Sequence, residues 1–240
     1  MSNSYFQFKQ FRVEQGACAM KVCTDACVLG SAADLTQAQR ILDIGTGTGL
    51  LALMAAQRNP TAHIEAVELD AAAAAQAAAN FAASPWASRL RIHAQPLAHL
   101  AATQPAAFDH IICNPPFFRN SLRSPNAGRT TARHTASDTL PFAELASFAA
   151  TFLAPAGQLT VLLPPPEMQH FEREAAALGL YPSHRLVLQH RPGSKPLRHI
   201  TTFSREAQPV STELLPLHEV ETEAYTEQFR QLLGSFYLHL

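Results

Sequence analysis

A buried strand that runs into a glycine-rich turn constrains the fold of this chain more than any other feature. Residues 40–44 (RILDI) are predicted to form the strand, residues 45–49 (GTGTG) the turn, and residues 50–58 a helix that an Asn-Pro pair ends. Further elements are predicted in the order strand, helix, strand, strand at 63–70, about 71–83, 89–93 and 108–113. Strands that alternate with helices in this way indicate right-handed crossovers between parallel strands.

The second half of the chain continues this alternation and then departs from it. Helices are predicted at about 141–152 and 167–178, and strands at 158–163, 183–189 and 197–203. Because only loop 190–195 joins the last two strands, they can pair only antiparallel. The prediction is an α/β fold, Rossmann-like, with a doubly wound, mainly parallel seven-stranded sheet and an antiparallel strand near the C-terminus. The 240 residues are about 1.6 times a ~150-residue unit, so we expect residues 1–240 to form a single domain.

Charge is segregated along the chain although the net charge is only -1. Between His110 and Ser137 there are four arginines and no acidic residue, whereas six glutamates and no Lys or Arg occupy residues 206–227. The net charge argues against a protein coated in positive charge for nonspecific nucleic-acid binding, so any such surface must be local. The alternative is that the two stretches are simply solvated faces of opposite sign.

Cysteine spacing and hydropathy limit the setting in which the protein works. Cys18, Cys23, Cys27 and Cys113 include no C-x-x-C pair and match no common zinc spacing. We therefore expect reduced, partly buried thiols, no metal and a cytoplasmic location. No apolar stretch approaches the ~18 residues of a membrane span, and the first residues are not a basic stretch leading into an apolar one. Neither a membrane span nor a secretion signal is predicted.

The glycine turn and an acidic residue after the second strand of the alternation predict a cofactor site. Ligands of open parallel sheets bind at the carboxyl ends of the strands, where glycines let the backbone approach closely. Glu68 lies 25 residues after Asp43, where a carboxylate can accept both hydroxyl hydrogens of a ribose. An adenosine-containing cofactor is therefore predicted. Its candidate residues in this region are Asp43, Gly45, Thr46, Gly47, Gly49, Glu68 and Leu69.

The turn does not by itself identify the cofactor. The dinucleotide pattern G-x-G-x-x-G fails when it starts at Gly45, and from Gly47 it passes only in its permissive form, which ends at Ala52. An NAD-dependent oxidoreductase is therefore one alternative, and a glycine turn that serves only helix–strand packing is another. The pattern D-x-G-x-G-x-G resembles the first motif of S-adenosylmethionine-dependent methyltransferases, in which Asp43 would face the amino acid end of the cofactor.

The stretch Asn114, Pro115, Pro116 and Phe117 follows the predicted strand 108–113 and indicates the chemistry. An exocyclic amine on a base is a poor nucleophile because its lone pair is delocalised into the ring. The Asn114 side-chain oxygen and the Pro115 carbonyl can accept the amine hydrogens and align the lone pair with an incoming methyl group. Phe117 offers a face on which a splayed base can stack. The alternative is a proline-terminated strand with Phe117 in the core.

Together, 43–49 and 114–117 resemble the class I N-P-P-[YF] amino-methyltransferases, which modify adenine N6, guanine N2 or a glutamine amide. Across almost the whole chain, the sequence resembles the bacterial tRNA1(Val) adenine-N6-methyltransferase family. The stretches that carry this resemblance are 8–11, 18–22, 24–25, 50–54, 56–58, 66–69, 84–86, 132–134, 224–226 and 236–238. The resemblance implies a class I methyltransferase fold, S-adenosylmethionine as cofactor, and tRNA as partner, methylated on the adenine next to the anticodon.

The resemblance also assigns residues outside the two motifs. It places Lys21, Thr24 and Asp25 in an amino-terminal segment, 1–35, that covers the methionine end of the cofactor; a helix N-capped near Asp25 is an equally plain interpretation. Many relatives carry an acidic residue after the third strand to bind the cofactor adenine. Here the matching stretch, 93–97 (HAQPL), has none, so Gln95 or a backbone carbonyl would substitute.

Basic residues near the second motif are predicted to bind the RNA. They are Arg119, Arg123, Arg129 and Arg133 in a basic mobile loop, 118–138, with Lys195 and Arg198 on the late hairpin. Three other functions remain open: methylation of ribosomal RNA guanine N2 or a protein glutamine, NAD-dependent oxidoreduction, and catalytically silent RNA binding. The isoacceptor and the oligomeric state do not follow from the sequence.

Overall fold

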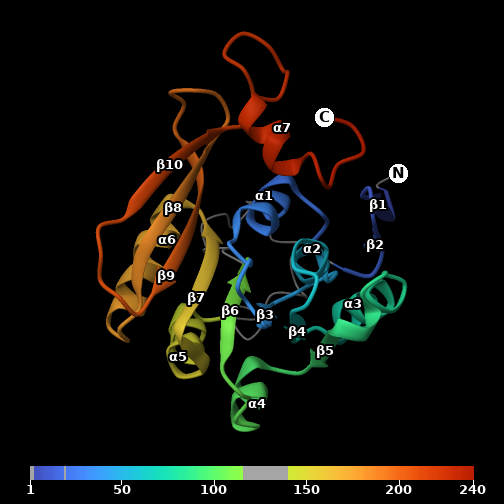
Figure 1. Ribbon diagram of the computed structural model, residues 1–240, viewed down its shortest axis with the longest axis vertical. Helices are drawn as coiled ribbons and strands as arrows, with labels where there is room; N and C mark the ends of the chain where they lie inside the picture. Colours follow the sequence, from blue (N-terminus) through green and yellow to red (C-terminus); the bar gives the residue numbers. More distant parts are fainter. Residues whose placement is uncertain (1–2, 19, 116–139) are drawn as a thin grey trace, which may run out of the picture.

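The computed structural model describes residues 3–18, 20–115 and 140–240 (Figure 1). Arg119, Arg123, Arg129 and Arg133, with Pro116, Phe117 and the segment 118–138, lie outside these residues. The elements are β1 (Tyr5–Gln7), β2 (Arg12–Glu14), α1 (Thr24–Ala32), β3 (Arg40–Ile44), α2 (Leu50–Arg58), β4 (His63–Glu68), α3 (Ala71–Ala82), η1 (Ala87–Arg89), β5 (Leu90–Ala94), α4 (Leu97–Ala102), β6 (Phe108–Cys113), α5 (Phe142–Phe152), β7 (Leu153–Leu163), α6 (Pro165–Ala176), β8 (Tyr181–Gln189), β9 (Pro196–Ser204), β10 (Ser211–Pro216) and α7 (Glu227–Leu233).

The main sheet has the strand order β10-β8-β9-β7-β6-β3-β4-β5. Neighbouring strands are parallel except at β9, which is antiparallel to both β7 and β8. The predicted α/β class, the parallel core and the late antiparallel strand are confirmed. The sheet has eight strands rather than seven, because β10 pairs with β8 at the edge. The residues of β10 are mostly exposed. The glutamate-rich stretch 206–227, which contains β10, therefore lacks the alternation of apolar and polar residues that would predict a strand.

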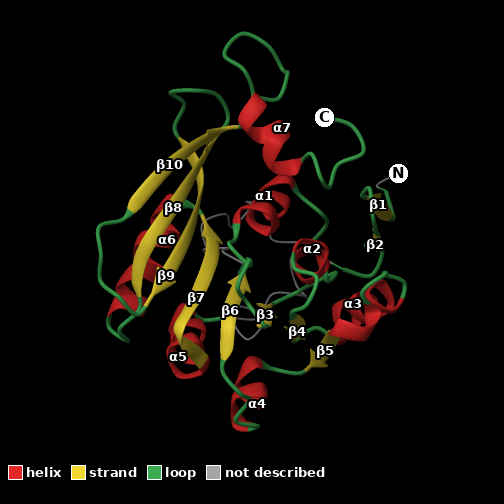
Figure 2. Ribbon diagram, in the orientation of Figure 1, coloured by secondary structure: helices red, strands yellow, loops and turns green. Residues whose placement is uncertain are grey.

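Helices cover both faces of the sheet (Figure 2). Apolar residues of α1, α2, α3 and α7 pack on one face, with Ile41 and Ile112 among the strand residues beneath them. The helices α4, α5 and α6 pack on the other face, against strand residues such as Leu42 and Ile111. Neighbours in a strand point to opposite faces, which is why Ile41 and Leu42 belong to different clusters. Both faces of the sheet are therefore buried from solvent, as strands with runs of apolar residues predict.

The strand pairing brings several connections together at one edge of the sheet, the edge that is formed by the carboxyl ends of the parallel strands. Because β3, β4, β5, β6 and β7 are parallel, the segments that follow them leave from the same edge. The strand β9 runs against β7 and β8, so β8 has the same direction as β7, and β10 is parallel to β8. Loop 190–195 therefore leaves the sheet on the same edge as the glycine turn and Asn114.

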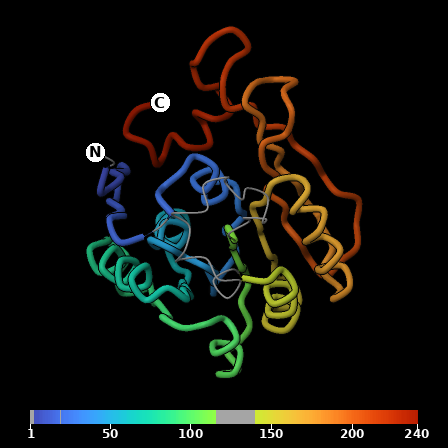
Figure 3. Tube along the Cα trace, turned by 180° about the vertical axis from the view of Figure 1, so that it is seen from behind, coloured from blue at the N-terminus to red at the C-terminus, as the bar shows by residue number. Residues whose placement is uncertain are grey.

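The two ends of the chain lie side by side, as both the front and the back view show (Figures 1 and 3). The backbone N–H of Lys9 donates to the carbonyl oxygen of Phe236 at 2.8 Å. The rings of Phe6 and Tyr237 lie 5.8 Å apart, and Phe8 is fully buried beside them. The hairpin of β1 and β2 thus packs with the segment after α7; β2 also contacts α3, and α7 contacts α1.

Candidate functional site

The glycine turn after β3 needs its glycines for two different reasons. Gly45, Gly47 and Gly49 all have positive φ, at 70°, 56° and 85°, which side chains rarely adopt. At Gly49 a Cβ atom would also lie 2.5 Å from Cε1 of Phe81 in α3. No atom of the described residues lies within 4 Å of such a Cβ on Gly45, so in this part of the chain that side of the turn is open. The turn is therefore held tightly by α3 on one side and accessible on the other.

Asp43 lies at the base of the turn and is fully buried. Its Oδ2 accepts hydrogen bonds from Thr46 Oγ1 at 2.5 Å and from the Ala52 backbone N–H at 3.2 Å. Its Oδ1 has no hydrogen-bond partner among the described residues. Burial raises the pKa of Asp43 to about 7, and the charge of Glu68 acts in the same direction, against the two hydrogen bonds. A positively charged ligand group beside Oδ1 would donate a hydrogen bond to this oxygen and would also balance the negative charge of the Asp43 carboxylate.

Glu68 ends β4 with both carboxylate oxygens fixed by backbone. Oε2 accepts the Gly47 N–H at 2.8 Å and Oε1 accepts the Asp70 N–H at 3.0 Å. Each oxygen keeps a lone pair for a ligand hydroxyl. Leu69, the next residue, is 52% exposed, so an apolar surface lies open beside the carboxylate. A ribose carrying a planar base matches this pair of surfaces.

Asn114 lies next to the turn because of the strand register. Cys113 pairs with Ile44 across β6 and β3, so the next residues on the two strands, Asn114 and Gly45, are neighbours. The Oδ1 atom of Asn114 is buried and has no hydrogen-bond partner among the described residues. A buried acceptor of this kind costs free energy unless a ligand satisfies it. Pro115 is buried beside it, while the predicted Pro116 and Phe117 lie outside the described residues.

The first turn of α1 brings two predicted groups together. The helix begins at Thr24, and its cap residue Cys23 makes no side-chain capping bond, so Asp25 is not the cap. Instead, Asp25 Oδ2 lies 3.0 Å from Arg198 Nε of β9, an ion pair between a predicted cofactor residue and a predicted RNA residue. Lys21 is exposed, and its Nζ donates to the Asn3 carbonyl oxygen at 3.3 Å.

The end of β5 bears on the missing acidic residue. Gln95 is half-buried there, and its backbone N–H donates to the His93 carbonyl oxygen at 3.1 Å. Glu65 contacts His93 Nε2 at 2.7 Å and Arg40 at 2.5 Å, a structural cluster that the sequence did not indicate. Because Glu65 pairs with Leu42 and Arg91 within the strands, it lies away from the carboxyl ends and does not replace the absent acid.

Two residues at the site were not predicted to act there. The sulfur of Cys18 would lie 3.5 Å from a Cβ placed on Gly47, so Cys18 covers the turn. Asn80 of α3 donates to the Thr48 carbonyl oxygen within the turn at 2.8 Å. A signal for the second existed in the sequence, because Gln76 and Asn80 are the polar residues of an otherwise apolar α3 and lie four apart, on one face.

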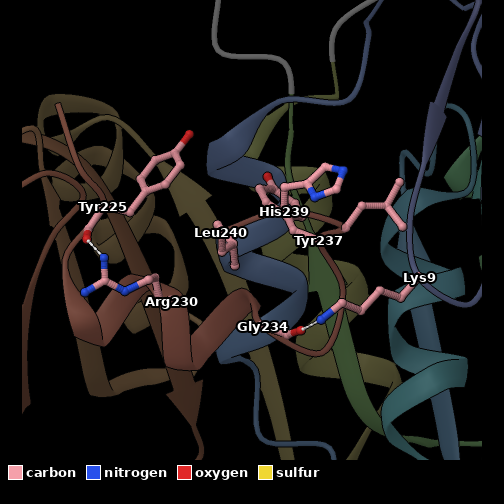
Figure 4. A pocket seen from close by; sticks show the side chains of 8 residues that line it. Lys9, Tyr225, Arg230, Gly234, Tyr237, His239 and Leu240 are labelled. Carbon is pink, nitrogen blue, oxygen red and sulfur yellow. Dashed lines mark hydrogen bonds between the residues drawn. The ribbon is translucent and has the colours of Figure 1, made fainter.

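The predicted basic residue Lys195 is exposed in loop 190–195, at the same edge of the sheet as the turn. A separate cavity of about 680 Å³ lies at the C-terminal segment (Figure 4). There Lys9 Nζ donates to the Gly234 carbonyl oxygen at 2.6 Å and Arg230 Nη1 to that of Tyr225 at 2.7 Å. None of the residues that line this cavity comes directly after a strand of the parallel core, where the glycine turn lies. The lining residues therefore include no residue of the predicted site.

The described residues contain neither a metal-binding cluster nor a membrane-spanning helix. Within residues 3–18, 20–115 and 140–240, no group of three or more His, Cys, Asp or Glu side chains is arranged to hold a metal ion. In these ranges no helix has the length and apolar character to cross a membrane. All four cysteines are free: Cys27 and Cys113 are buried, Cys18 is half-buried and Cys23 is exposed.

Known proteins share this arrangement. Residues 18–164 match the methyltransferase small domain family. The whole chain is 42% identical to the whole tRNA1(Val) (adenine(37)-N6)-methyltransferase of Phocaeicola vulgatus. Its identity to the protein of that name from Serratia proteamaculans is 40%, over 97% of this chain and 89% of that protein. A solved structure, a predicted O-methyltransferase from Agrobacterium tumefaciens, has a TM-score of 0.63 at 22% identity, covering 88% of this chain and 96% of that chain; this likeness shows the fold alone.

Proposed function

Since this chain belongs to the methyltransferase small domain family and, by full-length identity, to the tRNA1(Val) (adenine(37)-N6)-methyltransferases, we propose that it methylates N6 of adenine 37, next to the anticodon of a tRNA. The observation that carries the proposal is the register of β3 and β6. Cys113 pairs with Ile44, so Asn114 directly follows the strand next to the one that runs into the glycine turn, and its buried Oδ1 has no hydrogen-bond partner among the described residues. A methyl donor bound at the turn would therefore lie next to an acceptor suited to an amine.

The residues around the turn fit S-adenosylmethionine. The free Oδ1 of Asp43 suits the positively charged amino acid end, Glu68 suits the ribose hydroxyls, and exposed Leu69 suits the face of the adenine. Thr46, Gly45, Gly47 and Gly49 shape the turn, and Gln95 stands where relatives use an acid. When bound, this cofactor supplies an electrophilic methyl group on a sulfonium. Lys21, Thr24 and Asp25 would close the methionine end.

The chain's own part in the chemistry is to orient the amine. Asn114 Oδ1 and the Pro115 carbonyl accept its two hydrogens, which draws the nitrogen lone pair out of the ring and toward the methyl group. No general base is required before transfer, because the nitrogen gains acidity only once it carries the new methyl group. Pro116 holds the backbone, and Phe117 stacks on the flipped base.

The proposed partner is the anticodon loop of tRNA, held by phosphate contacts. The proposed cations are Arg119, Arg123, Arg129 and Arg133 of segment 118–138, Lys195 of loop 190–195, and Arg198 of β9. A loop base is already unpaired, so its extrusion costs at most a few kcal/mol. We further propose that residues 1–240 act as one domain, with 1–35 covering the cofactor, and that the protein works in the cytoplasm, where its tRNA substrate is found.

Methyl transfer with labelled cofactor tests the proposal. Purified protein and methyl-labelled S-adenosylmethionine are incubated with tRNA from cells that lack the protein, and the nucleosides are analysed by mass spectrometry. We expect one N6-methyladenosine per acceptor tRNA, mapped to position 37, and a single-turnover rate about 10²–10³ times lower with Asn114→Ala. Label only in ribosomal RNA or in protein would overturn the substrate, tighter binding of NAD than of S-adenosylmethionine would overturn the cofactor, and no single-turnover transfer would favour a silent RNA-binding protein.

A further inference from the structure

One buried amide joins the amino-terminal segment to the cofactor turn. Asn80 of α3 is 2% exposed, and all the hydrogen-bonding groups of its side chain face backbone. Its Nδ2 donates to the Thr48 carbonyl oxygen at 2.8 Å and to the Glu14 carbonyl oxygen at 2.9 Å. Its Oδ1 accepts the Glu14 backbone N–H at 2.9 Å. Thr48 belongs to the glycine turn and Glu14 ends β2, so a single side chain spans two segments far apart in the sequence.

Neighbouring amides extend this connection in both directions. Gln76, one helical turn before Asn80, accepts the Ala17 backbone N–H at 3.4 Å. Gln15 is 5% exposed; its Oε1 accepts the Val22 N–H at 2.9 Å and its Nε2 donates to the Asn3 carbonyl oxygen at 3.1 Å. Amide side chains thus bind backbone groups of Glu14 and Ala17 within residues 14–18, and the Gln15 amide binds Asn3 and Val22 on either side of this segment. The position of these residues is set by α3.

Residues 14–18 end directly over the turn. The Cys18 sulfur lies 3.5 Å from the point where a Cβ of Gly47 would be, and Gly47 is the residue whose N–H fixes Glu68. Burial raises the pKa of the Cys18 thiol, and the charges of Glu68 and Asp70 act in the same direction, against a backbone hydrogen bond from Met20. On the other side, Phe81 packs against Gly49. Asn80 and Phe81 are adjacent in α3. Through these two residues the helix contacts both the glycine turn and the segment 14–18 that lies over it.

We propose that Asn80 is a positioning residue for S-adenosylmethionine: its amide holds residues 14–18 against the glycine turn, where they form one wall of the cofactor site. The inference rests on the proposed cofactor and says nothing of the methyl acceptor. Without the amide, the Thr48 and Glu14 carbonyls and the Glu14 N–H lose their partner, and water can replace it only if the segment moves away from the turn. The predicted result is a weaker cofactor site on an intact sheet.

Asn59 provides a matched control. It is 3% exposed and its Nδ2 likewise donates to two carbonyls, those of Leu35 and Ala38, both at 2.8 Å. Its Oδ1 accepts backbone N–H groups of Thr61 and Ala62. These residues precede β3 and β4, so Asn59 lies at the opposite edge of the sheet from the turn. Asn59→Ala should destabilise the protein about as much as Asn80→Ala without touching the site.

Two measurements on the full chain test the inference. The first is the Kd for S-adenosylhomocysteine by calorimetry, and the second is the rate of thiol labelling of Cys18, measured in a Cys23→Ser background. For Asn80→Ala we expect at least about a tenfold higher Kd and at least about tenfold faster labelling; for Asn59→Ala both should stay within about twofold of the parent. Bound S-adenosylhomocysteine should slow labelling in the parent and much less in Asn80→Ala.

Equal changes in the two variants, or none in Asn80→Ala, would overturn the inference. If Asn80→Ala does not fold, Gln76→Ala takes its place, because it removes one exposed contact to Ala17; about twofold to threefold faster labelling supports the inference, and an unchanged rate overturns it. A parent protein that binds S-adenosylhomocysteine but methylates no tRNA would defeat the proposed substrate and leave this inference standing. A parent that does not bind it defeats both.

Discussion

Arg198 Nε on β9 lies 3.0 Å from Asp25 Oδ2 in the first turn of α1, and each side chain is 27% exposed. The pair connects a strand next to loop 190–195 with the helix that precedes the cofactor turn in the chain. Its atoms meet as an ion pair rather than as an aligned hydrogen bond, since Nε satisfies no hydrogen-bond geometry in this contact. Since Nη1 of Arg198 donates to the Leu197 carbonyl oxygen at 2.8 Å, the proposed RNA contact of Arg198 would compete with this hydrogen bond or with Asp25.

A double-mutant cycle with Asp25→Ala and Arg198→Ala measures this contact. Because both side chains are partly exposed, we expect a coupling free energy of about 0.5–1 kcal/mol in urea unfolding, which falls as salt is added. A coupling within error of zero at low salt would show that the pair adds nothing to stability.

Substitution of Asn114 should separate activity from stability. Asn114→Ala removes the acceptor proposed to orient the amine, so we expect the single-turnover rate to fall by a factor of about 10²–10³. The same change removes a buried oxygen without a partner among the described residues, so the melting temperature should stay level or rise. A variant that loses activity only in proportion to lost stability would contradict the assignment.

The high pKa of Asp43 predicts a pH-dependent cofactor affinity. With a folded-state pKa of about 7, the carboxyl is largely protonated at pH 6 and charged at pH 8. A positively charged ligand binds the charged form, so its affinity should rise between these values, by up to about tenfold per pH unit below the pKa. Calorimetry at pH 6, 7 and 8 measures it, and a flat profile for the parent would count against Asp43 as the contact.

Asp43 should also affect stability with the opposite pH trend. Its pKa is raised above the unfolded value of about 3.9, so its favourable contribution is present below that value and is lost as pH rises toward 7. Unfolding of the ligand-free protein at pH 5 and pH 8 should therefore show a decrease that Asp43→Asn lacks. An identical decrease in the variant would assign it to other groups.

Gly49 and Gly45 allow backbone strain to be separated from a clash. Gly49→Ala places a Cβ 2.5 Å from the Phe81 ring at φ 85°, and we expect a loss of about 2–4 kcal/mol in unfolding free energy. Gly45→Ala meets only the strain of its positive φ, with an expected loss of about 1–2 kcal/mol. If the two substitutions cost the same, the contact with Phe81 does not limit the turn.

Removal of cations should weaken tRNA binding and its dependence on salt together. Lys195→Ala is expected to lower the log–log salt slope by about 0.7 if it contacts one phosphate, and Arg123→Ala with Arg129→Ala by about twice that. Arg91→Ala, an exposed position on the edge strand β5, should leave the slope unchanged. The affinity for S-adenosylhomocysteine serves as the check that the cofactor site is intact, and unchanged tRNA affinity would remove these residues from the interface.

The sequence predicted the parts of the fold that carry periodic apolar residues. The strand at Arg40–Ile44 and the helix at Leu50–Arg58 were placed at their observed bounds, because a short, mostly apolar run followed by a glycine turn leaves little choice. The strand β10 was missed because only Leu215 of its six residues is buried. The short strands β1 and β2 were missed for a related reason: three-residue strands are too short to show a period.

The sequence could predict those site residues that lie at or just after the carboxyl ends of the parallel strands. Asp43 and Glu68 lie at the carboxyl ends of strands, and the glycine turn and Asn114 directly follow strands; parallel strands bring such positions to one edge whatever their separation in sequence. The pairing of Asp25 with Arg198 was not predictable, because it depends on how α1 packs beside β9. The approach of Cys18 to Gly47 depends likewise on tertiary packing, and the roles assigned to Asn114 and Glu68 stay predictions.

The antiparallel strand β9 and its partner β8 form a part of the sheet that is separate from the parallel strands β3 to β6. Both anchors of loop 190–195, β8 and β9, lie outside the block of β3 to β6 that carries the turn, Glu68 and Asn114. Residues can therefore be inserted or exchanged in this loop while the donor-binding half keeps its geometry. On the proposed role of Lys195 in tRNA binding, changes in this loop would alter the nucleic acid that is selected and leave methyl transfer intact, so grafting loops at this position is a route to redirecting the enzyme.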